Sequence, residues 1–128
     1  MKITYEQTSQ FKRDFKKLSK KIPTLAEDLE VVKKSAIEIF HIHEIDNKAV
    51  FEIEGAGNRE EVKFYKVKKF ACKSLKGKGA KSGIRLIYAY LPHEGKICLL
   101  EIYLKSSKST EDKDRIKEFL KYIDTELK

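Results

Sequence analysis

Basic and aromatic side chains alternate in the middle of the chain, with no carboxylate between them. Residues 62–93 contain nine Lys and Arg residues and no Asp or Glu. The whole chain has a net charge of +8 and this stretch supplies +9, so the other 96 residues sum to about −1. A concentrated positive field interleaved with aromatic rings suits a phosphate-rich partner. Because acids are absent rather than interspersed, the pattern favours a nucleic acid over a merely solvated lysine face.

Three strands are predicted around these cations, over residues 64–72, 84–91 and 97–105. Successive side chains of a strand point to opposite faces, so the polar members of each strand fall together. Packing the apolar faces against helices leaves a polar sheet surface with lysine, arginine and tyrosine side chains. Such groups can hold a phosphate, stabilise negative charge and move a proton. The predicted surface consists of Lys66, Lys68, Arg85, Glu101, Tyr103 and Lys105.

Glu101 is the one acid on this predicted surface and is a candidate general base. Neighbouring cations lower the pKa of a carboxyl and so make it a poor base. We therefore favour a structural ion pair between Glu101 and either Arg85 or Lys105.

Two further patterns lack the context that their usual chemistry needs. In the glycine- and lysine-rich loop over residues 76–83, Ala80 occupies a position where a phosphate-binding loop requires glycine, and a strand follows. His41 and His43 lie close together, but no Cys pair or HExxH motif accompanies them, so a surface turn is favoured over a metal site. We predict neither a metal nor a small-molecule cofactor.

Two helices are predicted before the strands. The first is capped by Thr8 or Ser9 and ends at Pro23, because proline forces its predecessor out of the helical region. Thr24 followed by Glu27 predicts a capping box for the second helix. Apolar stripes at helical spacing support both, with Phe11, Phe15, Leu18 and Ile22 in the first and Leu25, Leu29, Val32, Ala36 and Ile39 in the second.

The remaining elements complete an α+β fold for one domain over residues 1–128. Residues 3–5 form a short edge-strand candidate, 49–54 a possible strand, and 92–96 a hairpin loop. Ser109 with Asp112 caps a C-terminal helix. We expect an N-terminal helical hairpin packed on a small antiparallel sheet, with the C-terminal helix, one sheet face covered and the other free. The break in alternation at Lys68–Lys69 predicts a β-bulge.

Composition excludes several classes of protein. No apolar run approaches 18 residues and the first residues contain no apolar core of a secretory signal, so we expect no membrane partner. Cys72 and Cys98 both lie in apolar strand-like runs, which is typical of buried thiols in a reducing compartment. We expect a cytoplasmic protein.

The strand sequences resemble those of the RelE/ParE superfamily of toxin–antitoxin toxins, and most closely the RelE- and HigB-type RNA-cleaving toxins. The likeness rests on three segments and the helices before them, which together cover most of the chain except residues 41–60. The implied fold, helices against a small antiparallel sheet with a C-terminal helix, is the one predicted above. The three segments are Phe64-Tyr-Lys-Val-Lys, Ser82-Gly-Ile-Arg-Leu-Ile-Tyr88 and Leu99-Leu-Glu-Ile-Tyr-Leu-Lys105.

The resemblance implies a metal-independent mRNA interferase, an endoribonuclease that cuts mRNA in the ribosomal A site and so inhibits translation. In such toxins the 2′-hydroxyl of the RNA attacks the adjacent phosphate. By motif, Lys66 and Lys68 match the two strand lysines of RelE, Arg85 matches its strand arginine, and Lys105 falls near its second arginine. Tyr103 has no match to the family's catalytic tyrosine, which comes later in the chain, where this sequence has a charged helix. That departure puts catalysis in question.

The resemblance also suggests a role for each side chain. Arg85 would clamp the scissile phosphate with two hydrogen bonds, and Lys66 and Lys68 would stabilise developing negative charge, one of them as a possible base. Tyr103 would stack on a base or orient the 2′-hydroxyl, and Lys105 completes the catalytic set. The lysines expected to hold RNA backbone are Lys69, Lys73, Lys76, Lys78 and Lys81.

The implied partners are the ribosome, its mRNA and a small acidic antitoxin protein that wraps the basic face. Two alternatives stay open at this stage. A ParE-like toxin would bind and poison DNA gyrase without cutting RNA. A basic RNA- or DNA-binding module would use the same patch without chemistry. Fold alone does not choose among the three.

Overall fold

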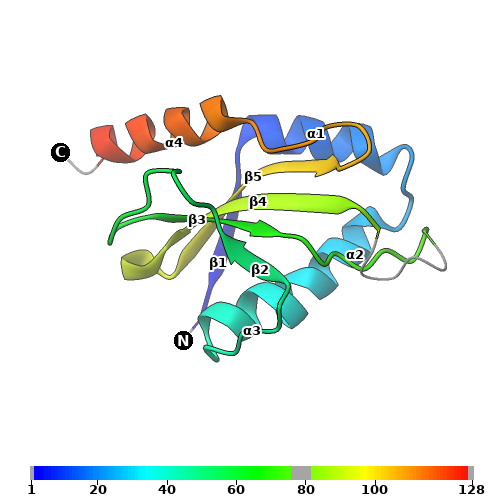
Figure 1. The fold of residues 1–128 in the computed structure, drawn as a ribbon, viewed down its shortest axis with the longest axis horizontal. Helices are drawn as coiled ribbons and strands as arrows, with labels where there is room; N and C mark the ends of the chain where they lie inside the picture. The colour runs from blue at the N-terminus through cyan, green and yellow to red at the C-terminus, as the bar shows by residue number, and fades with distance from the viewer. Residues whose placement is uncertain (1, 76–81, 127–128) are drawn as a thin grey trace.

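Five strands form one sheet at the centre of the molecule. The computed structural model describes residues 2–75 and 82–126. The strands are β1 (Thr4–Gln7), β2 (Val50–Glu52), β3 (Lys63–Val67), β4 (Ile84–Leu91) and β5 (Lys96–Leu104). Their order across the sheet is β1-β5-β4-β3-β2, and Figure 1 shows β5, β4 and β3 side by side. The mixed α+β class is the one predicted.

The sheet is antiparallel except at one edge. Strands β2 to β5 pair antiparallel, as expected, whereas β1 lies parallel to β5 with Thr4 opposite Lys96. The prediction of a wholly antiparallel sheet is therefore wrong at this edge. A tight turn forces its two strands to be antiparallel, but β1 and β5 are joined through most of the chain, so no turn constrains their direction.

The predicted hairpin between β4 and β5 is confirmed. A short 3-10 helix, η3 (Pro92–Glu94), and Gly95 connect the two strands. Gly95 adopts a left-handed conformation with φ 59°, which costs glycine little because it has no side chain. The turn brings β4 and β5 together along their full lengths.

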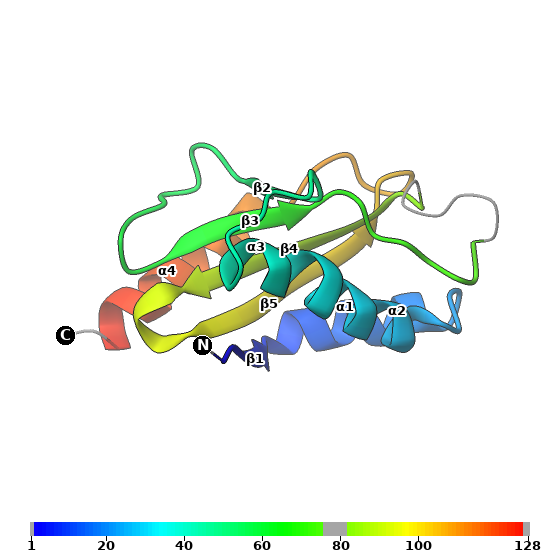
Figure 2. The same cartoon turned by 90° about the horizontal axis from the view of Figure 1, so that it is seen from below.

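Two helical segments cover one face of the sheet. They are α1 (Ser9–Ser19) and a continuous stretch made of α2 (Leu25–Val32), the π-helix η1 (Lys33–Ile37) and α3 (Glu38–His41). Figure 2 shows all of them on the same side of the sheet. Phe11, Leu25 and Leu29 pack there against the sheet residues Leu86 and Tyr88. The apolar stripes predicted this core because helical spacing placed them on one side of each helix.

The ends of these helices differ in part from the prediction. Thr8 caps α1 as expected, since its Oγ1 accepts a hydrogen bond from the Phe11 N–H at 3.1 Å. The helix ends at Ser19, however, before Pro23 is reached. The capping box at Thr24 does not form, because its hydroxyl donates instead to Asp28 Oδ2 at 2.7 Å. Glu27 pairs with Lys73 at the surface.

The π-helix η1 shifts which side chains are buried. Ala36 and Ile37 are buried at the end of the stripe, whereas the predicted Ile39 is only half-buried. A π-helical turn contains an extra residue, so every later side chain rotates around the helix axis relative to a regular α-helix. The prediction of the buried stripe assumed a regular α-helix with 3.6 residues per turn along the whole segment.

Helix α4 (Lys113–Glu126) lies on the second face of the sheet and partly covers it. Its residues Ile116, Phe119 and Ile123 form a core cluster with Phe64 and Leu100. The expectation that this face is free is therefore wrong for the part beneath α4. An amphipathic helix with three buried apolar residues needs an apolar surface, and the second sheet face supplies one.

The cap of α4 also differs from the prediction. Asp112 lies directly before the helix, and its Oδ1 accepts a hydrogen bond from the Asp114 N–H at 3.0 Å. Asp112 therefore occupies the capping position that was predicted for Ser109. The chain between β5 and α4, residues 105–112, turns at the end of β5 and runs back beside this strand before the helix begins, as Figure 1 shows.

A β-bulge lies in β5 rather than in β3. Ile87 faces Glu101 and Tyr88 faces Leu99, so Leu100 is the extra residue. Leu100 and Glu101 therefore lie on the same sheet face, whereas the predicted alternation placed them on opposite faces. Strand β3 ends at Val67, short of the predicted Cys72, although the next N–H, that of Lys68, still donates on the β2 side to Ala49 O at 2.9 Å.

The two cysteines are free and buried, as predicted. Burial raises the pKa of the Cys98 thiol to about 11, so it stays protonated and unreactive at neutral pH. Among residues 2–75 and 82–126, no helix has both the length and the apolar character needed to cross a membrane.

Candidate functional site

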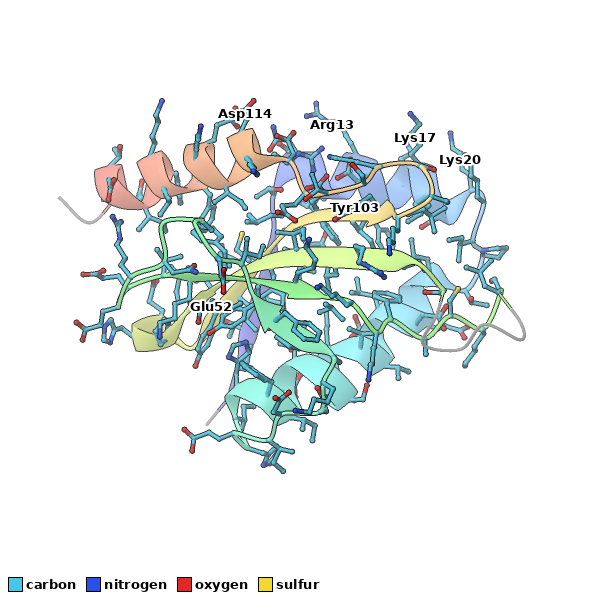
Figure 3. The ribbon with its side chains drawn as sticks, viewed as in Figure 1. Arg13, Lys17, Lys20, Glu52, Tyr103 and Asp114 are labelled. Atoms are coloured by element: carbon cyan, nitrogen blue, oxygen red, sulfur yellow. The ribbon has the colours of Figure 1, made fainter. Side chains whose placement is uncertain are left out.

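The part of the second sheet face that α4 leaves uncovered carries the predicted site, and we call it the open face. It contains Lys66 of β3, Arg85 of β4 and Tyr103 of β5. Arg85 and Tyr103 are direct partners across β4 and β5, and Lys66 lies opposite Ile87. Figure 3 places Tyr103 beyond the start of α4, which Asp114 marks. Strand register alone therefore brings the three side chains to one surface.

Arg85 has an oriented guanidinium group. Its Nη1 donates to the carbonyl oxygens of Lys68 at 3.0 Å and Ile84 at 3.4 Å. Within the described residues, no carboxylate pairs with Arg85 at ion-pair distance. Its remaining N–H donors can therefore face a phosphate, and the carbonyl contacts hold the planar group in position.

Lys66 has a partner that the sequence did not indicate. Its Nζ lies 2.5 Å from Glu111 Oε1, and the two side chains are only 18% and 8% exposed. Glu111 comes from the connection between β5 and α4, far from Lys66 in sequence. In the sequence, Glu111 stands out only as one half of the acidic pair Glu111–Asp112 ahead of the C-terminal helix.

Lys68 and Lys105 have different surroundings from Lys66. Lys68 is exposed just beyond β3, and its Nζ lies 4.7 Å from the centre of the Phe51 ring. Lys105 is exposed just beyond β5, and its backbone N–H donates to Gly83 O at 2.8 Å. The predicted pair of strand lysines thus consists of one neutralised cation and one exposed cation.

Tyr103 keeps its proton at neutral pH. Burial, followed by the charges of Glu111 and Glu101, raises the pKa of its phenol to about 12. The Lys108 Nζ lies 5.5 Å from the centre of its ring. A protonated phenol donates a hydrogen bond, and the Tyr103 side chain is largely buried, so this residue suits orienting a hydroxyl or phosphate better than stacking on a base.

Glu101 forms a structural ion pair, but its partner is not one of the two that we predicted. It is 2% exposed, its Oε2 pairs with Lys108 Nζ, and its Oε1 accepts from the Asp112 N–H at 2.8 Å. The expected pairing with Arg85 or Lys105 is wrong because the chain from 105 to 112 folds back over Glu101. Both oxygens are engaged, so Glu101 holds this connection in place.

The lysines predicted to hold RNA backbone are only partly described. Lys69 is exposed, and Lys73 pairs with Glu27 at 3.3 Å. Lys76, Lys78 and Lys81 lie outside the described residues. Their role in binding stays a prediction.

Helix α1 and the two residues that follow it carry a second set of cations, which the sequence patterns above did not indicate. Residues 9–21 contain six Lys and Arg residues and one acid, Asp14. All six cations are exposed, and none pairs with a carboxylate among the residues that the structure describes. Figure 3 shows Arg13, Lys17 and Lys20 pointing away from the sheet. We call this set the α1 cation row, and it consists of Lys12, Arg13, Lys16, Lys17, Lys20 and Lys21.

His41 belongs to an aromatic cluster rather than to a surface turn, contrary to the prediction. Its Nε2 lies 2.7 Å from the Tyr88 hydroxyl, and its ring centre lies 4.0 Å from that of Tyr90. Burial lowers the pKa of His41 to about 4, so the ring is neutral at neutral pH. In the part of the chain that the structure describes, no three His, Cys, Asp or Glu side chains gather as a metal site requires.

Comparison with known proteins gives one similar structure. No protein-family model matches the chain, and no curated protein matches it in sequence. The fold is similar to a chain of the archaeal RelE–RelB complex from Pyrococcus horikoshii OT3, at 15% sequence identity and a TM-score of 0.48, covering 82% of this chain and 97% of that chain. A similarity at this level assigns neither an activity nor a partner to this chain.

Proposed function

We propose that this protein is the toxin of a type II toxin–antitoxin system and that it cleaves mRNA on the ribosome without a metal ion. The observation that carries the proposal is the arrangement of the open face. Arg85 and Tyr103 lie directly opposite each other, and Lys66 points to the same face from the neighbouring strand. These are the side-chain types that a phosphodiester needs around it.

Each of these groups has a part in the proposed cleavage. The guanidinium of Arg85 binds the non-bridging oxygens of the scissile phosphate, where negative charge grows as the 2′-hydroxyl attacks. The protonated Tyr103 phenol donates a hydrogen bond that orients the attacking or phosphate oxygen. Exposed Lys68 and Lys105 add positive charge at the ends of their strands. This arrangement supports catalysis better than a patch of unpositioned lysines would.

The ribosome is the proposed site of action because the molecule has a second basic surface. The α1 cation row lies on the outer side of a helix that packs on the other face of the sheet. Ribosomal RNA presents a dense array of phosphates to such a surface. One face would then hold the substrate while the helix holds the ribosome.

An acidic antitoxin is the proposed protein partner. Among the described residues, Arg85 of the open face and the α1 cation row pair with no carboxylate and so give an acidic protein complementary charge, and covering Arg85 would stop cleavage. A short reading frame for an acidic, helix-rich protein beside this gene would support this pairing.

The test is cell-free translation with wild-type protein, Arg85→Ala and Arg59→Ala, followed by mapping of mRNA 5′ ends by primer extension. Arg59 is a surface arginine paired with Asp124 and Glu61, and it serves as the matched control. We expect new cuts within translated codons with wild type and Arg59→Ala. These cuts should be absent with Arg85→Ala and absent when ribosomes are left out.

Intact mRNA with normal protein output would refute the nuclease proposal. A gyrase supercoiling assay would then test the ParE-like alternative. Binding of RNA and DNA without cleavage would instead support the non-catalytic module.

A further inference from the structure

The contact between Lys66 and Glu111 places a proton donor and a proton acceptor beside the proposed active site. The two charged atoms are 2.5 Å apart, and both side chains are mostly buried. Lys66 shares the open face with Arg85 and Tyr103, and Glu111 is close enough for its charge to act on the Tyr103 phenol. The pair therefore adjoins the phosphate-binding groups rather than lying on a remote surface.

Glu111 is held in place by the chain on either side of it. Glu101 accepts a hydrogen bond from the backbone N–H of Asp112, the next residue, and pairs with Lys108 three residues before Glu111. Asp112 then caps α4 through the Asp114 N–H. These contacts fix the connection over the sheet, so the Glu111 carboxylate has a defined position.

We propose that Glu111 and Lys66 act as the general base and the general acid of RNA cleavage, an inference that rests on the proposed nuclease function. Glu111 takes the proton from the 2′-hydroxyl as the bond between that oxygen and phosphorus forms. Lys66 gives a proton to the 5′-oxygen as its bond to phosphorus breaks. The products are a 2′,3′-cyclic phosphate and a 5′-hydroxyl end.

Direct contact between the two groups lets the pair reset itself. After one cleavage Glu111 is a neutral acid and Lys66 a neutral amine. A proton passing from the carboxylic acid to the amine restores both starting states without another group. Two isolated residues on the same face would each need solvent for this step.

Glu111 is ionised in the resting state and can therefore accept a proton. Burial alone would raise the pKa of its carboxyl, but the adjacent Lys66 ammonium holds that pKa below its ordinary value. When an RNA phosphate draws the ammonium toward itself, this stabilisation weakens and the carboxylate becomes a stronger base. Binding of substrate thus activates the base.

Glu101 does not compete for this role. Both of its oxygens are already engaged, by Lys108 and by the Asp112 N–H. Glu111, in contrast, lines a small cavity of about 180 Å³ together with Ile53, Glu54 and Ile116. A small group can therefore reach the Glu111 side chain although little of it is exposed.

The test uses ribosomes programmed with a synthetic mRNA whose scissile linkage contains either the normal 5′-oxygen or a bridging 5′-sulfur. A thiolate leaves without being protonated, so sulfur removes the need for a general acid but not for a base. Cleavage rates are measured for wild type, Glu111→Gln, Lys66→Met and the control Glu118→Gln, which changes an exposed carboxylate of α4.

We expect Glu111→Gln to cut both RNAs at least about 100-fold more slowly than wild type. Lys66→Met should be similarly slow on the oxygen substrate and return to within about tenfold of wild type on the sulfur substrate. Glu118→Gln should match wild type on both. The cleaved RNA should end in a cyclic phosphate.

A wild-type or faster rate for Glu111→Gln would overturn the proposal, because Glu111 would then only neutralise Lys66. Equal slowing of Lys66→Met on both substrates would remove Lys66 as the acid. Intact RNA with wild-type protein would instead defeat the nuclease function itself.

Loss of folding is separated from loss of chemistry by two more variants. Lys66→Met combined with Glu111→Gln replaces the ion pair with neutral side chains of similar size, and its melting temperature reports the structural role of the pair. Glu111→Asp keeps the carboxylate but shortens it. We expect Glu111→Asp to retain measurable cleavage and Glu111→Gln to lose it, and equal rates for the two would contradict the base assignment.

Discussion

At the scale of single residues, the cations of the open face differ in what holds them. Arg85 is oriented by carbonyl oxygens, Lys66 by a carboxylate, and Lys68 by the ring of Phe51. A guanidinium held by neutral carbonyls keeps its full charge for a phosphate. The ammonium of Lys66 shares its charge with Glu111. Arg85 and Lys66 carry the same formal charge, but their different surroundings suit them to different roles.

We predict that Arg85→Lys lowers the cleavage rate by at least about tenfold without lowering stability. Lysine keeps the positive charge but cannot donate the two parallel hydrogen bonds of a guanidinium. The measurement is the rate of cutting of ribosome-bound mRNA, with melting temperature alongside it. Arg59→Lys is the control, and an active Arg85→Lys variant would show that charge alone suffices at this position.

Stability should fall as the pH is lowered from 7 to 5 because of His41. The pKa of His41 is about 4 in the folded protein, below its value of 6.5 in an unfolded chain. The unfolded state therefore binds a proton first, and the stabilisation present above pH 6.5 is lost progressively down to about 4. Since solvent reaches part of the ring, we expect a loss of about 1 kcal/mol between pH 7 and 5.

Urea unfolding of wild type, His41→Gln and His43→Gln at the two pH values measures this contribution. His43 is exposed and serves as the control. The pH dependence should shrink in His41→Gln only. If His41→Gln keeps the full dependence, another group titrates in this range.

At the scale of elements, the connection between β5 and α4 decides the shape of the site. Glu101 anchors it at the sheet, Glu111 reaches Lys66, and Asp112 starts the helix. A salt bridge between Arg115 and Asp14, at 2.5 Å, then ties α4 to α1. A change in this connection would therefore move the carboxylate beside Lys66 as well as the helix.

We predict that Asp112→Ala lowers the free energy of unfolding by about 1 kcal/mol, because the Asp114 N–H loses its acceptor. Asp112→Asn should stay close to wild type, since an asparagine oxygen can accept the same hydrogen bond. Chemical denaturation of the three proteins measures the difference. Equal losses for both variants would mean that the charge of Asp112, through its 3.6 Å contact with Arg115, matters more than the cap.

At the scale of the whole molecule, positive charge is gathered on two surfaces. One is the open face and the other is the α1 cation row, on a helix that packs on the opposite face of the sheet. Two described lysines of the basic central stretch pair with distant acids, Lys66 with Glu111 and Lys73 with Glu27. The α1 row thus adds more to the external field than the sequence suggested.

Replacing Arg13, Lys17 and Lys20 by glutamine should weaken RNA binding and reduce its salt dependence. Each phosphate contact contributes about 0.7 to 0.9 to the slope of log affinity against log salt concentration, so three lost contacts should lower the slope by about 2 to 3. Filter binding to ribosomal RNA fragments at several salt concentrations measures the slope. Glutamines at the exposed lysines Lys2, Lys34 and Lys121 give the same change in net charge.

The control separates local contact from overall charge. A smaller slope in the α1 variant alone would place RNA on that helix. Equal reductions in both variants would show that only the net charge matters, and no change in either would exclude α1 from binding.

Local sequence patterns were enough to predict the pairing of β4 with β5 and the face that carries Arg85 and Tyr103. A short hairpin fixes the direction of its two strands, and strict alternation from Ile84 to Leu91 fixes which side chains share a face. The helix stripes were predicted for the same reason, because neighbours three and four residues apart meet on one side. These features depend on contacts that are close in sequence.

Only the tertiary structure decided the partners that come from far along the chain. Four features depend on how distant segments pack. They are the Lys66–Glu111 contact, the bulge at Leu100, the parallel edge strand β1 and the covering of the second face by α4. The periodicity of the sequence does not predict them, because each depends on apolar surfaces and charged side chains that come into contact only in the folded chain. The sequence alone therefore identifies the basic stretch, whereas the fold brings the Glu111 carboxylate next to Lys66.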